Sequence, residues 1–60
     1  MKRNLLLKKI RKIGAIFVRH GGKHDIYVNP KTGKIEQVPR HADIDENLAK
    51  NIIKNLSKTF

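Results

Sequence analysis

The spacing of the hydrophobic residues changes twice along the chain, and this restricts the possible folds more than any other feature. Near the N-terminus, Leu6, Ile10 and Ile13 recur at positions i, i+4 and i+7, the spacing of one face of a helix. Gly14 follows, where a helix commonly ends in a left-handed residue. The pattern predicts an amphipathic helix over residues 3–13.

Three short segments with β-strand character follow. Residues 15–18 are apolar, and a pair of glycines soon afterwards ends the first strand. Residues 24–29 alternate in the manner of a second strand. Its two faces carry His24, Ile26 and Val28 on one side and Asp25, Tyr27 and Asn29 on the other. Residues 29–33 have the proline and glycine of a tight turn, and residues 34–38 return as a third strand that Pro39 ends.

The last part of the chain returns to helical spacing, with apolar residues at i, i+4 and i+8: Leu48, Ile52 and Leu56. Asp43 and Glu46 have the spacing of a capping box, although Asp45 could be the N-cap instead. In both cases the acids gather at the positive end of the helix dipole. We therefore interpret this acidic cluster as structural and not as a metal site.

The order α-β-β-β-α predicts an α+β fold in which two helices cover one face of a three-stranded antiparallel sheet. Double-stranded-RNA-binding domains (dsRBDs) have this arrangement, although a fold alone does not determine a function. Residues 1–60 are expected to form one domain. It has no cysteine, so its stability depends on packing or on a partner chain and not on disulfides or thiolate metal sites.

The N-terminal sequence Met-Lys-Arg-Asn-Leu-Leu-Leu briefly resembles a signal peptide, but Lys8 and Lys9 interrupt it before a hydrophobic region of the needed length forms. The longest apolar run, residues 15–18, is too short to span a membrane. We expect a cytoplasmic protein without membrane contact, and the lack of cysteine fits a reducing compartment.

The chain has 14 Lys and Arg against 5 Asp and Glu, a net charge of +9, and its first 24 residues contain no acid. Binding to a polyanion would release counterions, which favours RNA as the partner. An acidic protein and simple solubility are the two alternatives. On the predicted first helix, Lys8 and Lys12 are candidate RNA contacts, and Arg19 is another.

Few residues have a pattern that suggests catalysis. Ser57 is the only serine and has no histidine or acid beside it in sequence, and residues 21–24 lack the glycine spacing of a phosphate-binding loop. No cofactor is predicted. The three histidines remain, since the side chain has a free pKa of about 6.5 and can both accept and donate a proton near neutrality.

The histidines differ in their surroundings. His20 is either a solvated residue at a strand end or a phosphate contact, and His41 belongs either to the start of the second helix or, with Arg40, to a substrate contact. His24 begins a strand after two glycines that allow a phosphate to approach closely. Lys23 beside it could stabilise charge that develops on phosphorus. A functional role for His24 therefore competes with that of an ordinary strand residue.

The segment from Phe17 to Pro30 resembles the signature of HicA toxins, small bacterial ribonucleases of toxin–antitoxin pairs. That signature has Gly-Ser-His before a strand, an aromatic residue three positions after the histidine, and a proline three further on. The matching positions are Gly22, His24, Tyr27 and Pro30. The family's Val-Pro-Arg-His segment is matched at residues 38–41, and its apolar helix positions are matched at Leu48, Ile52 and Ile53. The resemblance covers essentially the whole chain.

The resemblance implies a dsRBD-like fold, cleavage of mRNA with one essential histidine, and inhibition by a cognate HicB-type antitoxin. The family's histidine corresponds to His24. Two positions depart from the family pattern: Lys23 replaces the usual serine, and Ala15 stands where an aromatic residue often follows the glycine. The first departure puts any role of the serine hydroxyl in doubt.

On this basis we expect a metal-independent endoribonuclease in which His24 is the general base, with phosphate contacts from Lys23, Arg40 and His41. The group that protonates the leaving oxygen stays open among His41, Tyr27 and water. A non-catalytic RNA-binding module is the main rival hypothesis, and an interaction protein that meets only an acidic chain is a third.

Overall fold

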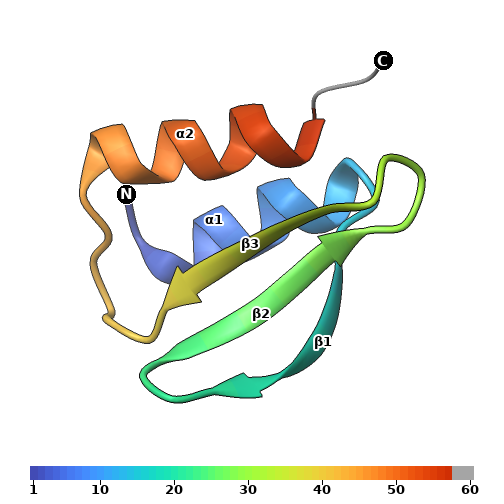
Figure 1. Cartoon of the computed structure of the whole chain (residues 1–60). Helices are drawn as coiled ribbons and strands as arrows, with labels where there is room; N and C mark the ends of the chain where they lie inside the picture. The colour runs from blue at the N-terminus through green and yellow to red at the C-terminus, as the bar shows by residue number, and fades with distance from the viewer. Residues whose placement is uncertain (58–60) are drawn as a thin grey trace.

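The computed structural model describes residues 1–57 and confirms the predicted order of elements (Figure 1). They are α1 (Arg3–Lys12), β1 (Ile16–Gly21), β2 (His24–Asn29), β3 (Lys34–Pro39) and α2 (Glu46–Ser57). The strands form one antiparallel sheet in the order β1-β2-β3. The two helices pack together on one side of it, which we call the inner face. The α+β, dsRBD-like arrangement is therefore confirmed.

The first strand is longer than its apolar segment suggested. Pairing with β2 continues through His20, opposite Asp25, and Gly21, opposite His24, after an irregularity between Phe17 and Arg19. Ala15 lies before the strand and is buried. The glycine pair predicted the end of the strand correctly, and the pairing extends beyond the apolar residues because backbone hydrogen bonds in a hairpin do not require apolar side chains.

The hydrophobic core lies between the helices and the inner face of the sheet. Its residues come from both helices, from β2 and β3 and from the connecting segments: Leu6, Leu7, Ile10, Ala15, Tyr27, Val38, Ile44, Ala49, Ile52 and Leu56. The helical spacing in the sequence had identified most of the helical members, because each helix buries only the stripe that faces the sheet.

The buried face of β2 is the one that carries its polar residues. Asp25, Tyr27 and Asn29 are buried, whereas Ile26 and Val28 on the other face are half-buried. Asn29 is tolerated in the core because its amide donates to the carbonyl oxygens of Leu56 at 2.7 Å and Ile13 at 3.3 Å. Because these hydrogen bonds replace those to water, burying the amide does not leave its N–H group unsatisfied. The same bonds link the C-terminal ends of both helices to the sheet.

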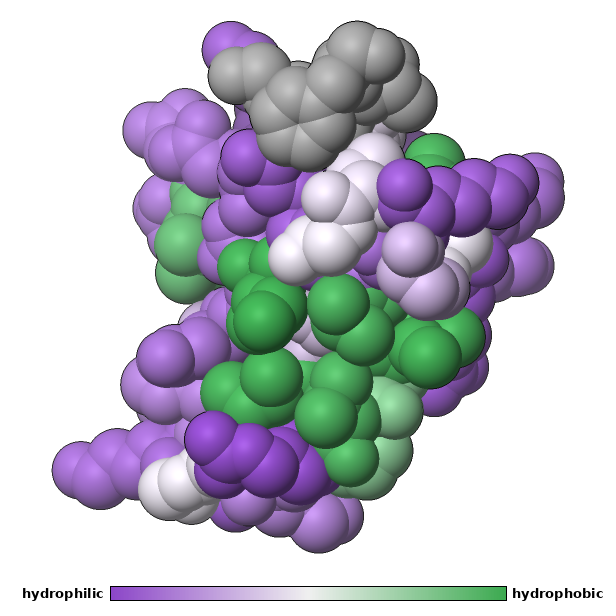
Figure 2. Space-filling view, turned by 45° about the vertical axis from the view of Figure 1, so that its right-hand side comes forward, coloured by the Kyte–Doolittle hydropathy of each residue, from purple (hydrophilic) through white to green (hydrophobic). Residues whose placement is uncertain are grey.

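Within residues 1–57, no other element covers the outer face of the sheet, which is largely apolar. The register places Ile16, Val28 and Ile35 side by side across the three strands, with Ile26 next to them. Ile16 and Ile35 are 53% and 60% exposed. Figure 2 shows a contiguous hydrophobic area on this side of the molecule. We call these four aliphatic residues the outer apolar patch.

The start of α2 corrects one sequence interpretation. The helix begins at Glu46, and the Asp45 carboxylate accepts a hydrogen bond from the Leu48 amide at 3.2 Å, so Asp45 is the N-cap. The capping box between Asp43 and Glu46 does not form. Asp43 instead lies in an extended segment that pairs with Lys2.

The same extended segment binds the N-terminus of the chain. The amide of Arg3 donates to the carbonyl of Ala42 at 2.9 Å, and the amide of Ile44 donates to the carbonyl of Met1 at 2.8 Å. The amino group of Met1 donates to the carbonyl of Ile44, also at 2.8 Å. These bonds hold the beginning of α1 beside the end of β3. Within residues 1–57, neither helix is long and apolar enough to cross a membrane.

Candidate functional site

The candidate site lies at the tip of the β1–β2 hairpin. Gly22 and Lys23 form its two-residue loop and are exposed, and His24 follows half-buried at the first position of β2. The register puts His24 on the outer face, level with Gly21 and Pro39. A Cβ added at Gly22 would have no described atom within 4 Å, apart from its chain neighbours. The tip is therefore open to a large ligand such as RNA.

Arg40 connects the end of β3 to this hairpin. Its Nε donates to Asp25 Oδ1 at 2.9 Å, and its Nη2 donates to the carbonyl oxygen of Gly21 at 3.0 Å. A weaker contact at 3.5 Å joins the same nitrogen to the carbonyl oxygen of His24. Arg40, a predicted RNA contact, thus also joins the end of β3 to the hairpin. Its side chain remains 43% exposed.

Asp25 binds a second arginine from the other side. The Nη2 of Arg3 donates to Asp25 Oδ2, and the Nε of Arg3 donates to the carbonyl oxygen of Pro39 at 2.8 Å. The first turn of α1 is thereby attached to the centre of the sheet. Side chains from three separate parts of the chain meet at this carboxylate.

His20 is the third side chain on Asp25. Its Nδ1 lies 2.7 Å from Asp25 Oδ1, while its side chain is 73% exposed. The ring of Phe17 packs beside it with the two ring centroids 4.9 Å apart. His20 is therefore an exposed residue near the end of β1, as one of its two sequence interpretations had it, and it also binds Asp25. We call Arg3, His20, Asp25 and Arg40 the Asp25 cluster.

The Asp25 cluster stabilises the ionised form of the Asp25 carboxyl group relative to the protonated form. The hydrogen bond from His20 and then that from Arg40 lower the pKa of Asp25 from 3.8 to about 2, against the opposing effect of burial. Asp25 is therefore a carboxylate at neutral pH, and it can only accept hydrogen bonds.

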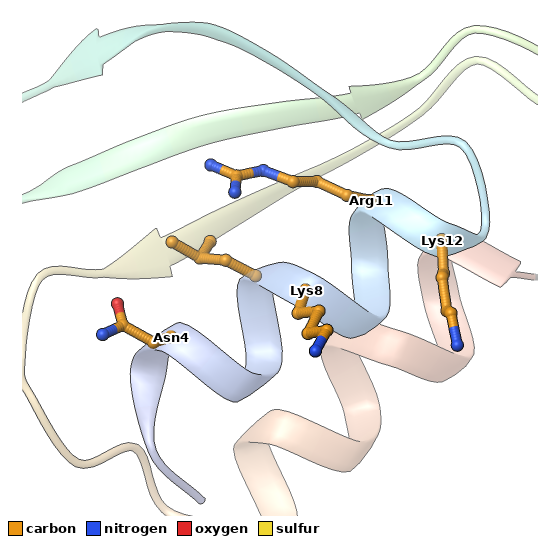
Figure 3. A pocket seen from close by; sticks show the side chains of 5 residues that line it. Asn4, Lys8, Arg11 and Lys12 are labelled. Atoms are coloured by element: carbon orange, nitrogen blue, oxygen red, sulfur yellow. The ribbon is translucent and has the colours of Figure 1, made fainter.

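The other predicted RNA contacts lie in different places. His41 follows Arg40 and is exposed, and Arg19 is exposed on β1 opposite Ile26. Lys8 and Lys12 are on α1, where they line a shallow pocket with Asn4, Leu7 and Arg11. Figure 3 shows Arg11 extending toward the sheet and the two lysines pointing away from it. The structure brings Lys23, His24, Arg40 and His41 to one end of the sheet. Lys8 and Lys12 lie elsewhere, on α1.

Tyr27 does not fit the role of proton donor to RNA. Its side chain is 3% exposed and faces the core, and its ring packs edge-on against that of the exposed Phe17 at 5.7 Å between centroids. Among residues 1–57, no three histidine, aspartate or glutamate side chains lie close enough together to hold a metal ion.

The fold and the hairpin define a small, basic α+β domain of the dsRBD type with a histidine at the tip of its first hairpin. The family model described as the HicA toxin of bacterial toxin–antitoxin systems matches residues 4–57. The chain belongs to the HicA toxin family, and the resemblance seen in the sequence is confirmed. Comparisons with curated proteins and with solved structures each found no significant match.

Proposed function

We propose that this toxin is a metal-independent endoribonuclease that cleaves mRNA in the cytoplasm with His24 as the general base. The observation that carries the proposal is the position of His24, beside an open glycine loop at the basic tip of the hairpin. It coincides with the family's essential histidine. A toxin family of ribonuclease-like proteins supports the same reaction class.

In the proposed reaction, His24 removes the proton from a ribose 2′-OH, and the 2′-oxygen attacks the adjacent phosphorus. The bond from phosphorus to the 5′-oxygen then breaks. Positioned proton transfer of this kind accelerates reactions by roughly 10²–10⁴-fold. Lys23, exposed at the loop, supplies positive charge for the phosphate as negative charge develops on its oxygens.

The outer apolar patch supports inhibition by an acidic antitoxin. Aliphatic side chains cannot hydrogen-bond to phosphates or pair with their charge, so RNA does not suit the patch. A second copy of the chain does not suit it either, because two molecules of charge +9 repel each other. A protein with an apolar surface and acidic surroundings fits both the patch and the nearby Arg19. Since His24 lies on the same face, a protein docked there would also cover the general base.

The first test incubates the purified protein with mRNA in excess EDTA. We expect fragments that end in a 2′,3′-cyclic or 3′-phosphate and a 5′-hydroxyl. Intact RNA under these conditions, with binding retained, would favour the non-catalytic RNA-binding module. The observation that supports RNA binding without catalysis is the basic pocket on α1, which lies apart from His24.

A further inference from the structure

The exposed histidine of the Asp25 cluster has the surroundings of a proton donor. Because Asp25 is ionised and can only accept, the Nδ1 of His20 must carry the hydrogen of their 2.7 Å bond. The free nitrogen of the ring is then Nε2. With the side chain 73% exposed, Nε2 is accessible to a substrate. In catalytic histidines, a carboxylate on one nitrogen orients the ring and stabilises its protonated form.

The orienting carboxylate is itself held in place. Arg3 binds one oxygen of Asp25, and Arg40 binds the other together with His20. The three donors come from α1, from the segment after β3 and from β1. The ring of His20 is thus positioned by the whole domain and not by the hairpin alone.

His20 and His24 flank the two-residue loop of the hairpin from opposite faces. In an in-line displacement the attacking and leaving oxygens lie on opposite sides of phosphorus, so the base and the acid approach from opposite sides. His24 is level with Gly21 on the outer face, while His20 is level with Asp25 on the inner face. The glycine-containing loop lies between them and is open at Gly22.

We propose that His20 is a second catalytic residue, the general acid that protonates the leaving 5′-oxygen, and that Asp25 is its positioning residue. The inference rests on the proposed ribonuclease function and extends it. A phosphodiester that crosses the hairpin tip meets one imidazole on each side. His24 takes the 2′-OH proton as the 2′-O–P bond forms, and His20 gives its Nε2 proton to O5′ as the P–O5′ bond breaks. The products are a 2′,3′-cyclic phosphate and a 5′-hydroxyl, and proton exchange with water restores both histidines.

The test uses two RNA oligonucleotides with the same cleavage site, one natural and one with sulfur in place of the bridging 5′-oxygen. A thiolate leaves without being protonated, so loss of a general acid matters only for the natural substrate. We expect His20→Ala to cleave natural RNA roughly 10²–10⁴-fold more slowly and the sulfur substrate at nearly the wild-type rate. His24→Ala, which lacks the base, is expected to be slow on both.

His41→Ala is the matched comparison, because His41 is an exposed histidine near the same end of the sheet. Rescue of His41→Ala by the sulfur substrate, without rescue of His20→Ala, would assign the acid to His41 and overturn the proposal. So would a His20→Ala enzyme that is equally slow on both substrates, or fully active on natural RNA.

A pH profile separates the catalytic role from a structural one. The wild-type rate on natural RNA should fall at alkaline pH as the acid loses its proton, and His20→Ala should lack this fall. His20 is exposed, so the variant is expected to fold. A wild-type protein that cleaves neither substrate overturns the ribonuclease proposal and the acid assignment together. Wild-type cleavage with an unchanged profile in His20→Ala overturns only the latter.

Discussion

Asp25 and His24 are neighbours in sequence with different surroundings. Asp25 faces the core side of the sheet and accepts hydrogen bonds from three side chains, whereas His24 faces outward at the tip of the hairpin. Alternation along a strand gives adjacent residues opposite faces. One residue can therefore stabilise the domain while the next faces outward at the tip of the hairpin.

Replacing His24 should separate activity from stability. We expect His24→Ala to lower the cleavage rate by roughly 10²–10⁴-fold and to change the free energy of unfolding by about 1 kcal/mol or less. The measurements are RNA cleavage and chemical denaturation followed by circular dichroism. A variant with wild-type activity and a wild-type spectrum would show that His24 is not the base.

The Asp25 cluster should make stability fall in acid. The pKa of Asp25 is about 2 in the folded protein, below its ordinary 3.8, so the unfolded state binds the proton more readily. The stabilisation is complete above about pH 4 and is lost as the pH falls toward 2. We expect the melting temperature of Asp25→Asn to depend less on pH in this window than that of the wild type.

The exposed acid Asp43 provides the control for this pH dependence. Asp43→Asn should retain the wild-type decline in melting temperature between pH 4 and pH 2. An Asp25→Asn variant whose decline equals that of the wild type would show that the carboxylate is not the group responsible.

At the level of helices and strands, the sequence predicted nearly everything that depends on local pattern. The period of the apolar residues located both helices, and glycines and prolines located the turns. The Asp25 cluster was not predicted, because Arg3 and Arg40 lie 22 and 15 residues from Asp25 in sequence. One local signal did exist: a two-residue loop at Gly22 and Lys23 places His20 opposite Asp25.

The cap of α2 gives a test with a matched pair of acids. Asp45 accepts the Leu48 amide, whereas Asp43 lies outside the helix. We expect Asp45→Ala to lower the free energy of unfolding by about 0.5–2 kcal/mol and Asp43→Ala to have a smaller effect. Thermal or urea denaturation measures both, and equal losses would contradict the assignment of the cap.

For the whole molecule, the charge of +9 predicts RNA binding that weakens as the salt concentration rises. If about five cations contact single-stranded RNA, log K should fall against log salt with a slope near −3.5. Lys8→Glu and Lys12→Glu should each flatten the slope by about 0.7, and Lys50→Glu on α2 should not. Fluorescence anisotropy measures these slopes. A flat titration would remove RNA from the partners of this protein.

The outer apolar patch should be needed for neutralisation by the antitoxin. Ile35→Lys places a charge in the patch, and we expect it to weaken antitoxin binding by about tenfold or more, or 1.4 kcal/mol. Leu48→Lys, an equivalent change at an exposed leucine of α2, should bind normally. Calorimetry with the purified antitoxin measures both. Equal affinities of the two variants for the antitoxin would show that the antitoxin binds a surface other than the outer apolar patch.

The pairing of the first three residues with residues 42–44 has a consequence for the order of events during synthesis. The segment at the N-terminus emerges first, yet its partners belong to the last third of the chain. Arg3 likewise cannot secure Asp25 beside Pro39 until β3 exists. A nascent toxin therefore forms its first hairpin before Arg3 can bind Asp25 beside Pro39, and the domain closes only after residues 42–44 have been synthesised.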